Sequence, residues 1–415
     1  MRYSQALSTL NRLHARGGKL GLERINNLLS LMGNPHKEVR AILVGGTNGK
    51  GSVTAMISSA LIEAGYRVGS FYSPHIDDFR ERIQVNNSFI PKRKVVSLFM
   101  GIEKKKEKMK EKPTHFEIVT AMACKYFGDE EVDYAVFEVG LGGREDATNA
   151  LSPFISVITN IGLEHTEALG NSLRSIAHEK AGIIRKNFPV VTAEREKEPL
   201  SEIKSECRKK NSPLVIIGKD VLLKKINCSM KGGHFIVRAK KTYDVETSLL
   251  GEHQGTNAAT AIAVLEHMKI PKRAIENGIK RAHVPGRLEI TGKNPLIVMD
   301  SAHNPHAFRE LKKSLPIFPH KKLILVTGIM KDKDIKKIIG IIAPLSDVII
   351  INKPSLKRAA PPSLILREAK KYNKNVLIVK NVKESLEKAK SLAGKDDLIL
   401  VAGSMYMLAE ARGEK

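Results

Sequence analysis

A glycine-rich stretch that contains one lysine is the strongest chemical signal in the sequence. GGTNGKGS (45–52) follows an apolar run of strand length and precedes a stretch whose apolar residues recur at helical spacing. Glycines at such a turn let backbone N–H groups approach phosphate oxygens, and Lys50 adds a mobile positive charge. The string departs from the usual P-loop, because Val44 replaces its first glycine and Gly51 follows the lysine, with Ser52 one residue later. We predict phosphate binding here; the alternative is a structural turn with a solvated lysine.

A buried carboxylate is the second signal. Glu138 ends another apolar run in FEVGLGGREDATN (137–149), at the strand end where α/β sheets gather ligand groups. A desolvated carboxylate needs a partner. Bound Mg²⁺ is one such partner, and a salt bridge to Arg144 or Lys180 is the other. The residues alone leave these two interpretations equal.

Further polar residues follow other apolar runs. His165 lies in TNIGLEHTEALG (159–170), and Asp300 and His303 lie in DSAHNPH (300–306). A lone histidine is more often structural than a ligand, and Lys180, taken alone, reads as a solvated charge. The recurrence is nevertheless the distribution expected when several loops build one site.

The elements that position these residues alternate between strand-like and helix-like stretches. Buried runs such as VDYAVFEVG and FISVITNIG, with helical segments between them, indicate a parallel sheet covered by helices on both faces. A second group of such runs follows Gly286 and predicts a smaller α/β domain of about 120 residues. The boundary is expected near residues 284–294, and a hairpin is expected around Gly232 and Gly233.

Composition restricts the class of protein. The 415 residues are 42% hydrophobic and 27% charged, which suits a globular chain of two or three domains. The formal charge of +25 favours anionic partners. The three cysteines show no metal or disulfide spacing, and no apolar run approaches the roughly 20 residues that cross a bilayer. The N-terminus lacks the apolar segment of a signal peptide, so we expect a cytoplasmic protein without a membrane partner.

Together the motifs resemble the folylpolyglutamate synthase/dihydrofolate synthase family of Mur-type ATP-dependent amide ligases. The similarity runs from LGLERINNLL (20–29) to AGSMYMLAEAR (402–412). GTNGKGS alone is typical of the wider superfamily, whereas YSPH, EVGLGG with DATN, and PGRLE indicate the folate branch. The ordered strings that carry the resemblance are GTNGKGS, YSPH, EVGLGG, DATN, HEKAGII, GEHQ, PGRLE and AHNPH.

The resemblance implies the α/β architecture of that family. Residues 1–289 would form a Mur-ligase-type P-loop ATP-binding central domain, and residues 290–415 a smaller Rossmann-like C-terminal domain. The active site would lie in the cleft between them. ATP and Mg²⁺ are the implied cofactors, and L-glutamate and a folate or pterin carboxylate are the implied substrates. By the same analogy we expect a monomer.

The resemblance also implies roles for individual residues. The ATP-binding residues would be Asn48, Gly49, Lys50, Gly51, Ser52, Asn257, Arg287 and Asp300. The metal ligands would be Ser73, Glu138 and His165, joined by Lys180 if it is carbamylated. The substrate-binding residues would be Thr114, His115, Phe116, Glu117, Glu145, Asp146, Ala147, Ser404 and Tyr406. The catalytic residues would be Lys50, Lys180 and His303.

The implied reaction is amide formation. ATP would phosphorylate the carboxylate of the pterin substrate, and the amine of L-glutamate would attack the acyl phosphate. Two departures from the family pattern stand out: Glu145 replaces a common leucine, and Glu164 replaces a common aspartate. A charge at Glu145 bears on substrate identity, so the alternative is a Mur-type ligase acting on a different carboxylate, such as a modified pterin or a cell-wall uridine nucleotide.

A nucleic-acid-binding NTPase is the remote alternative, from a different class. The charge of +25 favours it, but aromatic residues make up only 5% of the chain and tryptophan is absent. Basic residues are not interleaved with aromatic ones in the way that base stacking requires. We therefore expect no nucleic-acid partner.

Overall fold

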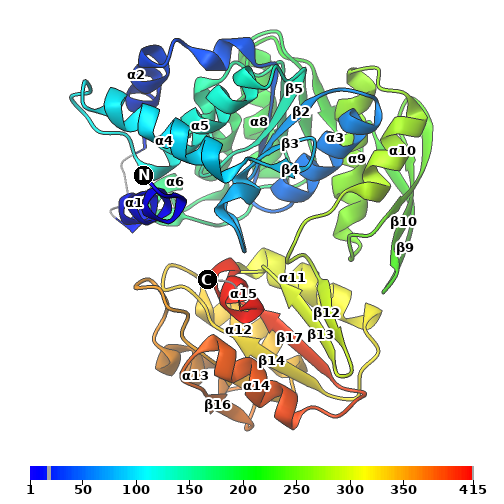
Figure 1. Ribbon diagram of the computed structural model, residues 1–415. Helices are drawn as coiled ribbons and strands as arrows, with labels where there is room; N and C mark the ends of the chain where they lie inside the picture. Colours follow the sequence, from blue (N-terminus) through cyan, green and yellow to red (C-terminus); the bar gives the residue numbers. More distant parts are fainter. Residues whose placement is uncertain (16–19, 414–415) are drawn as a thin grey trace. The chain divides into compact units, whose positions relative to one another are not determined.

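The chain forms two compact α/β units. The computed structural model describes residues 1–15 and 20–413 (Figure 1). The first unit comprises residues 1–225, 235–246 and 256–282, and the second comprises residues 226–234, 247–255 and 283 onward. The predicted α/β fold with two sheets is confirmed. The boundary placed between residues 289 and 290 stays a prediction.

The first unit is built on an eight-stranded sheet of order β4-β3-β2-β5-β1-β6-β7-β8. All strands from β2 to β8 along this order are parallel, whereas β3 and β4 add an antiparallel edge. The central strands are almost entirely buried because helices cover both faces. The strands are β1 (Ala41–Gly45), β2 (Val68–Phe71), β3 (Ile83–Val85), β4 (Ser88–Phe89), β5 (Tyr134–Glu138), β6 (Ile155–Ile158), β7 (Val190–Thr192) and β8 (Leu214–Ile216).

Two neighbouring residues of β2 show that helices lie on both faces. A Cβ at Gly69 would lie 2.8 Å from the ring of Phe127 in α5 (His115–Asp129), whereas the Ser70 hydroxyl bonds Ser58 of α3 (Lys50–Glu63) at 2.9 Å. Successive strand residues face opposite sides, so α3 and α5 cover opposite faces. The other helices are α1 (Tyr3–Ala15), α2 (Glu23–Leu31), α4 (Lys92–Lys106), α6 (Thr166–Leu169), α7 (Leu173–Ala181), α8 (Lys197–Lys209), α9 (His253–His267) and α10 (Lys272–Arg281), with 3₁₀ turns η1 (Pro35–Glu38), η2 (Phe79–Arg82) and η3 (Ala147–Ala150).

A three-stranded sheet of order β11-β10-β9 follows β8 in the chain. Its strands are β9 (Leu222–Ser229), β10 (Gly232–Arg238) and β11 (Thr242–Thr247). The hairpin expected around Gly232 and Gly233 is present, but its turn is formed by Met230 and Lys231, and Gly232 already begins β10. The tip of this hairpin, residues 226–234, belongs to the second unit.

The second unit carries a six-stranded sheet of order β12-β13-β17-β14-β15-β16, parallel except for β12. Leu398 and Leu400 of β17 join the core formed with α11, α12 and α13, and the alternate residues face α14 and α15. The elements are β12 (Glu289–Lys293), β13 (Leu296–Asp300), β14 (Leu323–Thr327), β15 (Val348–Ile351), β16 (Val376–Ile378), β17 (Leu398–Ala402), α11 (Pro305–Ser314), α12 (Ile335–Ile342), α13 (Pro362–Ala369), α14 (Val382–Leu392) and α15 (Met405–Arg412), with 3₁₀ turns η4 (Leu315–Ile317) and η5 (Ala343–Leu345).

The stretch expected to separate the domains, residues 284–294, contains β12. This strand pairs with β13 in antiparallel register, Glu289 opposite Met299, and is irregular between Ile290 and Gly292. A short edge strand that carries polar residues and a glycine gives little strand signal in the sequence, which is why the prediction read it as a linker.

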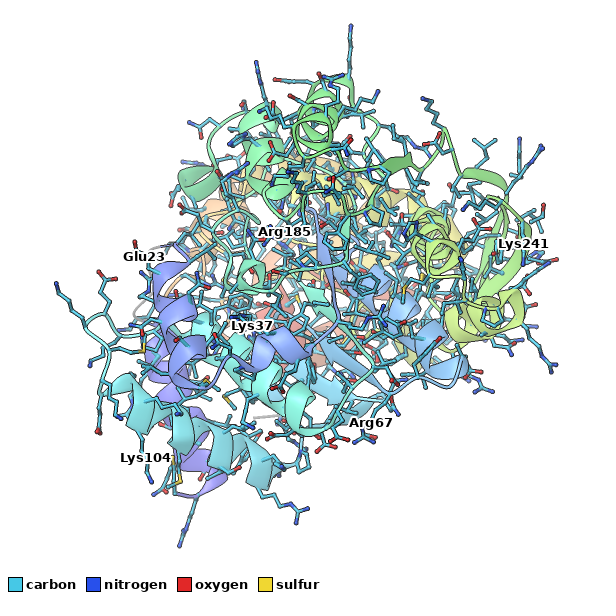
Figure 2. All side chains as sticks on the ribbon, turned by 90° about the horizontal axis from the view of Figure 1, so that it is seen from above. Glu23, Lys37, Arg67, Lys104, Arg185 and Lys241 are labelled. Atoms are coloured by element: carbon cyan, nitrogen blue, oxygen red, sulfur yellow. The ribbon has the colours of Figure 1, made fainter. Side chains whose placement is uncertain are left out.

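Exposed lysines occur at separate places on the first unit. Lys104 at the end of α4 and Lys241 between β10 and β11 are both exposed and lie far apart (Figure 2). The segment GIEKKKEKMKEK (101–112) forms the end of α4 and the turn after it. In the part of the chain that the structure describes, each helix is too short or too polar to cross a membrane.

Candidate active site

The glycine-rich turn connects β1 to α3, as predicted. Gly46 and Gly49 have φ values of 128° and 85°, in the region that favours glycine. At Gly46 a Cβ would collide with the Thr159 hydroxyl, and at Gly49 it would lie 2.5 Å from Oδ1 of Asn257 in α9. Both glycines are therefore needed for backbone shape and for close packing, and Asn257 lies directly against the turn.

The loop after β6 fixes this turn from the side. Asn160 Oδ1 accepts a hydrogen bond from the Asn48 N–H at 2.9 Å, and Thr159 Oγ1 donates to the Asn48 carbonyl at 2.7 Å. The Thr47 N–H donates to the Asn160 carbonyl at 2.7 Å. Sequence reasoning missed the roles of Thr159 and Asn160. The available signal was a Thr-Asn pair placed directly after a buried strand.

Two lysines converge on one carbonyl of the turn. Lys50 Nζ donates to Gly46 O at 3.1 Å and to Thr47 O at 3.0 Å, and Lys180 Nζ donates to Gly46 O at 2.8 Å. Lys180 comes from the end of α7 and is only 2% exposed. The first turn of α3 thus combines free N–H groups, the positive end of a 14-residue helix and two ammonium groups, an arrangement suited to phosphate oxygens.

Lys180 forms a buried ion pair with Glu164 at 2.9 Å. Burial alone would raise the pKa of Glu164, but Lys180 and then Lys50 lower it to about 2. Burial lowers the pKa of Lys180, and the positive charge of Lys50 acts in the same direction. The sequence analysis considered a salt bridge from Glu138 to Arg144 or Lys180. Lys180 instead pairs with Glu164. Arg144 donates a hydrogen bond to the His178 carbonyl at 3.1 Å.

Glu138 and Ser73 lie next to the first turn of α3. Glu138 is 6% exposed, and its Oε2 accepts the Ser73 N–H at 3.1 Å. A Cβ at Gly51 would lie 3.5 Å from the same oxygen, so the absence of a side chain leaves room beside the carboxylate. His165 is exposed, has φ 48° and precedes α6.

Carboxylate and hydroxyl oxygens at Glu138 and Ser73 suit Mg²⁺. Among residues 1–15 and 20–413, no three His, Cys, Asp or Glu side chains are close enough to hold a metal ion. Mg²⁺ commonly keeps waters and takes substrate phosphates, with one or two protein carboxylates, so this sparse donor set fits that ion.

The THFE segment is partly structural. Thr114 caps α5 in a reciprocal capping box with Glu117, whose carboxylate is also bound by Arg24 at 2.9 Å. Phe116 packs where Gly140 lacks a side chain, since a Cβ there would lie 2.5 Å from the ring. Phe116 is therefore placed against the EVGLGG turn, whereas the Glu117 oxygens are already engaged. Arg24 had no sequence signal.

Asp146 and Glu145 differ in environment although they are adjacent. Asp146 is buried, accepting from Leu141 N at 2.8 Å and from the Thr148 hydroxyl at 2.6 Å, and burial raises its pKa. Glu145 is exposed, and Ala147 begins the 3₁₀ turn η3. The predicted substrate roles of these three residues, and that of His115, which is buried in α5, stay predictions.

In the second unit, Asp300 is the last residue of β13, and backbone N–H groups of the neighbouring loops bind its carboxylate. Its oxygens accept from Leu288 N at 2.9 Å and Ala302 N at 2.8 Å. Burial raises the pKa of Asp300, and the positive charge of Arg287 acts in the opposite direction. The Ser301 N–H donates to the Gly286 carbonyl at 2.8 Å, which holds the segment before Arg287 beside the end of β13. His303 Nδ1 lies 2.8 Å from the Ser301 carbonyl. Arg287, Asp300 and His303 therefore gather at one end of β13.

Ser404 and Tyr406 follow β17. The Ser404 hydroxyl caps α15 by accepting the Tyr406 N–H at 3.1 Å. The Arg358 guanidinium lies over the Tyr406 ring, 4.6 Å from its centroid. Arg358 was not singled out from sequence, because its loop, NKPSLKRAAP, carries no motif.

Three uncharged polar side chains also lie at this edge. Ser301, Thr327 and Asn352 follow or end β13, β14 and β15, and they are 0%, 1% and 0% exposed. In the described chain their side-chain oxygens, and the Asn352 amide nitrogen, have no hydrogen-bond partner. Unpaired buried polar groups of this kind are uncommon in folded proteins.

The structure thus brings the predicted residues together within each unit. The first unit groups Asn48, Gly49, Lys50, Gly51, Ser52, Ser73, Glu138, Lys180 and Asn257 at the carboxyl ends of β1, β2 and β5. The second groups Arg287, Asp300, His303 and Ser404 at the carboxyl ends of β13 and β17. The single cleft expected from sequence stays a prediction.

Two family models match this chain. Residues 44–265 match the Mur ligase middle domain, and residues 286–405 match the glutamate ligase domain of Mur ligases. The two matches cover the two groups of residues described above.

Relatives with assigned names cover nearly the whole chain. The dihydrofolate synthase/folylpolyglutamate synthase of Bacillus subtilis is 34% identical over 99% of this chain and 98% of its own. A probable bifunctional folylpolyglutamate synthase/dihydropteroate synthase of Haloferax volcanii is 36% identical, and this chain spans only half of that longer protein. Among solved structures, E. coli FolC in complex with DHPP and ADP superposes with a TM-score of 0.91, 30% identity and coverage of 99% and 97% of the two chains.

Proposed function

Because this chain belongs to the folylpolyglutamate synthase/dihydrofolate synthase family of Mur ligases, we propose that it joins L-glutamate to the carboxylate of a folate or pteroate at the expense of ATP. The family places it among ligases that form carbon–nitrogen bonds. One observation carries the proposal: Lys50 and Lys180 converge on Gly46 O beside the Glu138 carboxylate. This arrangement of cations and backbone supports the proposal of a polyphosphate site.

The glycine-rich turn would hold the triphosphate. Backbone N–H groups of residues 49–52, at the start of α3, would face the phosphates. Lys50 would offset the charge that builds up as the γ-phosphoryl group moves between two anionic oxygens. Asn257, packed against Gly49, supports the turn and lies where it can contact the nucleotide. The phosphoryl group is transferred to the substrate carboxylate, giving an acyl phosphate.

Ser73 and Glu138 would hold Mg²⁺, with His165 as a third ligand. When bound, Mg²⁺ would neutralise part of the negative charge of the phosphates. The Ser73 N–H fixes one Glu138 oxygen at 3.1 Å, so the carboxylate is already oriented before phosphates arrive.

Lys180 would act in one of two states. As a carbamate it would carry a negative charge suited to a second metal ion, and burial, which lowers its pKa, favours the neutral amine that captures carbon dioxide. As the ammonium it is held by Glu164 and adds positive charge beside Lys50. The longer Glu164, in place of the family's common aspartate, supports the ammonium state in this chain.

The second unit would contribute nucleotide and amino-acid contacts. Arg287 and Asp300 are proposed to contact the nucleotide, and His303, Ser404 and Tyr406 to contact L-glutamate near the acyl phosphate. The family model that matches residues 286–405 is the glutamate ligase domain, which supports this assignment. The neutral amine of L-glutamate then attacks the acyl carbon, and phosphate leaves.

The direct test is a product assay with Mg-ATP, L-glutamate and an acceptor series. Dihydropteroate and tetrahydrofolate monoglutamate are compared with a uridine-nucleotide carboxylate and a modified pterin. We expect a mass increase of one or more glutamyl units on the first two acceptors and one ADP per unit added. ADP release that needs neither glutamate nor acceptor contradicts the proposal.

A further inference from the structure

A cavity lies at the amino-terminal edge of the six-stranded sheet, away from the residues assigned to the reaction. Its volume is about 700 Å³, within the range of small-molecule sites. Leu296, which starts β13, lines it, whereas Asp300, which ends β13, belongs to the opposite edge. Four residues of strand separate these edges by roughly 13 Å. Substrates of open α/β sheets bind at the carboxyl edge, so this cavity is a separate feature.

The walls of the cavity are apolar although it opens to solvent. Met230 at the tip of the β9–β10 hairpin, Ile290, Leu296 and Pro319 supply this surface. Met230 is 43% exposed. A concave apolar surface at an open edge is typical of a ligand site rather than of ordinary exposed surface.

Two lysine side chains lie at the opening of the cavity. Lys293 and Lys395 line the cavity and are exposed, and within residues 1–15 and 20–413 neither has an ion-pair partner. The acidic groups beside them are engaged: Asp396 pairs with Lys321 at 2.7 Å, and Asp397 accepts the Gly394 N–H at 2.8 Å. The charge that remains available to attract a ligand is therefore positive.

We propose that this cavity is a second small-molecule site, which takes a ligand with a flat apolar body and an anionic group. The body packs against Met230, Ile290, Leu296 and Pro319, and the anion lies between Lys293 and Lys395. The charge complementarity selects an anion, and the apolar walls select an amphipathic one over a free phosphate. The inference does not rest on the proposed ligase activity, because none of these residues belongs to that site.

The test uses 8-anilinonaphthalene-1-sulfonate, which has an aromatic body and one sulfonate. The full chain, labelled with ¹³C at the methionine methyl groups, is titrated with the probe by NMR. Of the 12 methionines, Met230 is expected to shift saturably, assigned by Met230→Leu, while Met100, 39% exposed in the first unit, stays in place. An unshifted Met230 signal overturns the proposal.

Charge variants supply the second arm. Calorimetry should show one site whose affinity falls at least roughly tenfold in Lys293→Glu/Lys395→Glu, since two charge-assisted contacts are lost. Met230→Asp should weaken it similarly, whereas Lys383→Glu, an exposed lysine of α14, should not. Circular dichroism checks that each variant folds. Equal binding by all variants overturns the proposal.

Two further outcomes would also reject it. Displacement of the probe by excess Mg-ATP and L-glutamate would place the probe in the reaction site. Sedimentation of the wild-type chain as a dimer that Met230→Asp dissociates would make the cavity a contact between two copies. We expect neither result, and we expect the Met230→Asp variant to retain wild-type turnover.

Discussion

The polar groups at the carboxyl edges of the two sheets differ in their hydrogen-bond and ion-pair partners. In the first unit the charged groups already have partners: Lys50 on Gly46 O and Thr47 O, Lys180 on Glu164, and Glu138 on the Ser73 N–H. In the second unit the described Thr327 and Asn352 side chains are buried without hydrogen bonds. The charged groups at the first edge are therefore held in place, whereas the second edge also contains buried uncharged side chains without a hydrogen-bond partner among the described residues.

The difference agrees with the two ligands proposed above, a triphosphate for the first unit and an amino acid for the second. A triphosphate carries so much charge that its site must hold cations in place, and these cations need fixed acceptors while the ligand is absent. An amino acid carries less charge and is recognised by a few directional hydrogen bonds. The predictions below test this contrast, from the largest effect to the smallest.

Removal of Lys50 should abolish most turnover. Lys50→Ala deletes the cation that offsets developing charge on the transferred phosphoryl group, so we expect kcat to fall by about 10²–10³-fold. ADP release under saturating substrates measures it. Lys241→Ala, which removes an exposed lysine of the same unit, should be nearly silent. Near-normal turnover of Lys50→Ala would contradict the role proposed for this cation of the first unit.

Breaking the buried ion pair should cost stability. Glu164→Gln leaves the Lys180 charge buried without a counterion, so we expect a loss of about 3–5 kcal/mol in the free energy of unfolding. Urea unfolding followed by circular dichroism measures this loss. The matched control is Lys390 with Glu387, which have the same 2.9 Å separation but are exposed. Glu387→Gln should cost about 0–1 kcal/mol.

A double variant distinguishes the contribution of the ion pair to stability from the contributions of the two residues alone. Lys180→Met combined with Glu164→Leu removes both charges, and it should cost less than Glu164→Gln alone because no uncompensated charge remains. A double variant as unstable as the sum of the single ones would show that Lys180 and Glu164 act independently.

Replacing a buried amide that has no hydrogen-bond partner should stabilise the second unit. Asn352→Leu removes such an amide, so we expect a gain of about 1 kcal/mol in the free energy of unfolding, measured by urea unfolding. Asn373, which donates to Ser346 O, is the control: Asn373→Leu should lower stability. A destabilised Asn352→Leu protein would contradict the contrast.

The two units should also differ in the pH dependence of their stability. The folded-state pKa of Glu164, about 2, lies below its ordinary value of 4.5, so its contribution is present above pH 4.5 and is lost as pH falls toward 2. Burial raises the pKa of Asp300 above 3.8, so its contribution is present below 3.8 and is lost as pH rises through the folded-state value.

Unfolding of Glu164→Gln and Asp300→Asn as a function of pH measures the two slopes. Each substitution should flatten one of them, and the effect of Asp300 should be the smaller. Slopes of the same sign for the two residues would refute the assignment.

Much of the architecture was determined by the sequence itself. Strands β1 and β17 are continuous apolar runs, and β5 and β13 are apolar up to the carboxylates that end them. The glycine-rich turn before α3 is encoded by residues adjacent in the chain. Alternation of such runs with helical periodicity is a local property that predicts an α/β fold. The polar residues after these strands were also visible, because parallel strands bring their carboxyl ends to one edge.

Only the tertiary structure decided which of these residues touch. Asn257 against Gly49, Asn160 on Asn48, and Arg24 on Glu117 join residues about 90 to 210 positions apart, and the choice of Glu164 over Glu138 as the partner of Lys180 depends on side-chain reach. Likewise, no local pattern marks Asn352 as buried without a partner. Such contacts follow from packing of distant elements, in which small differences in position determine which donor meets which acceptor.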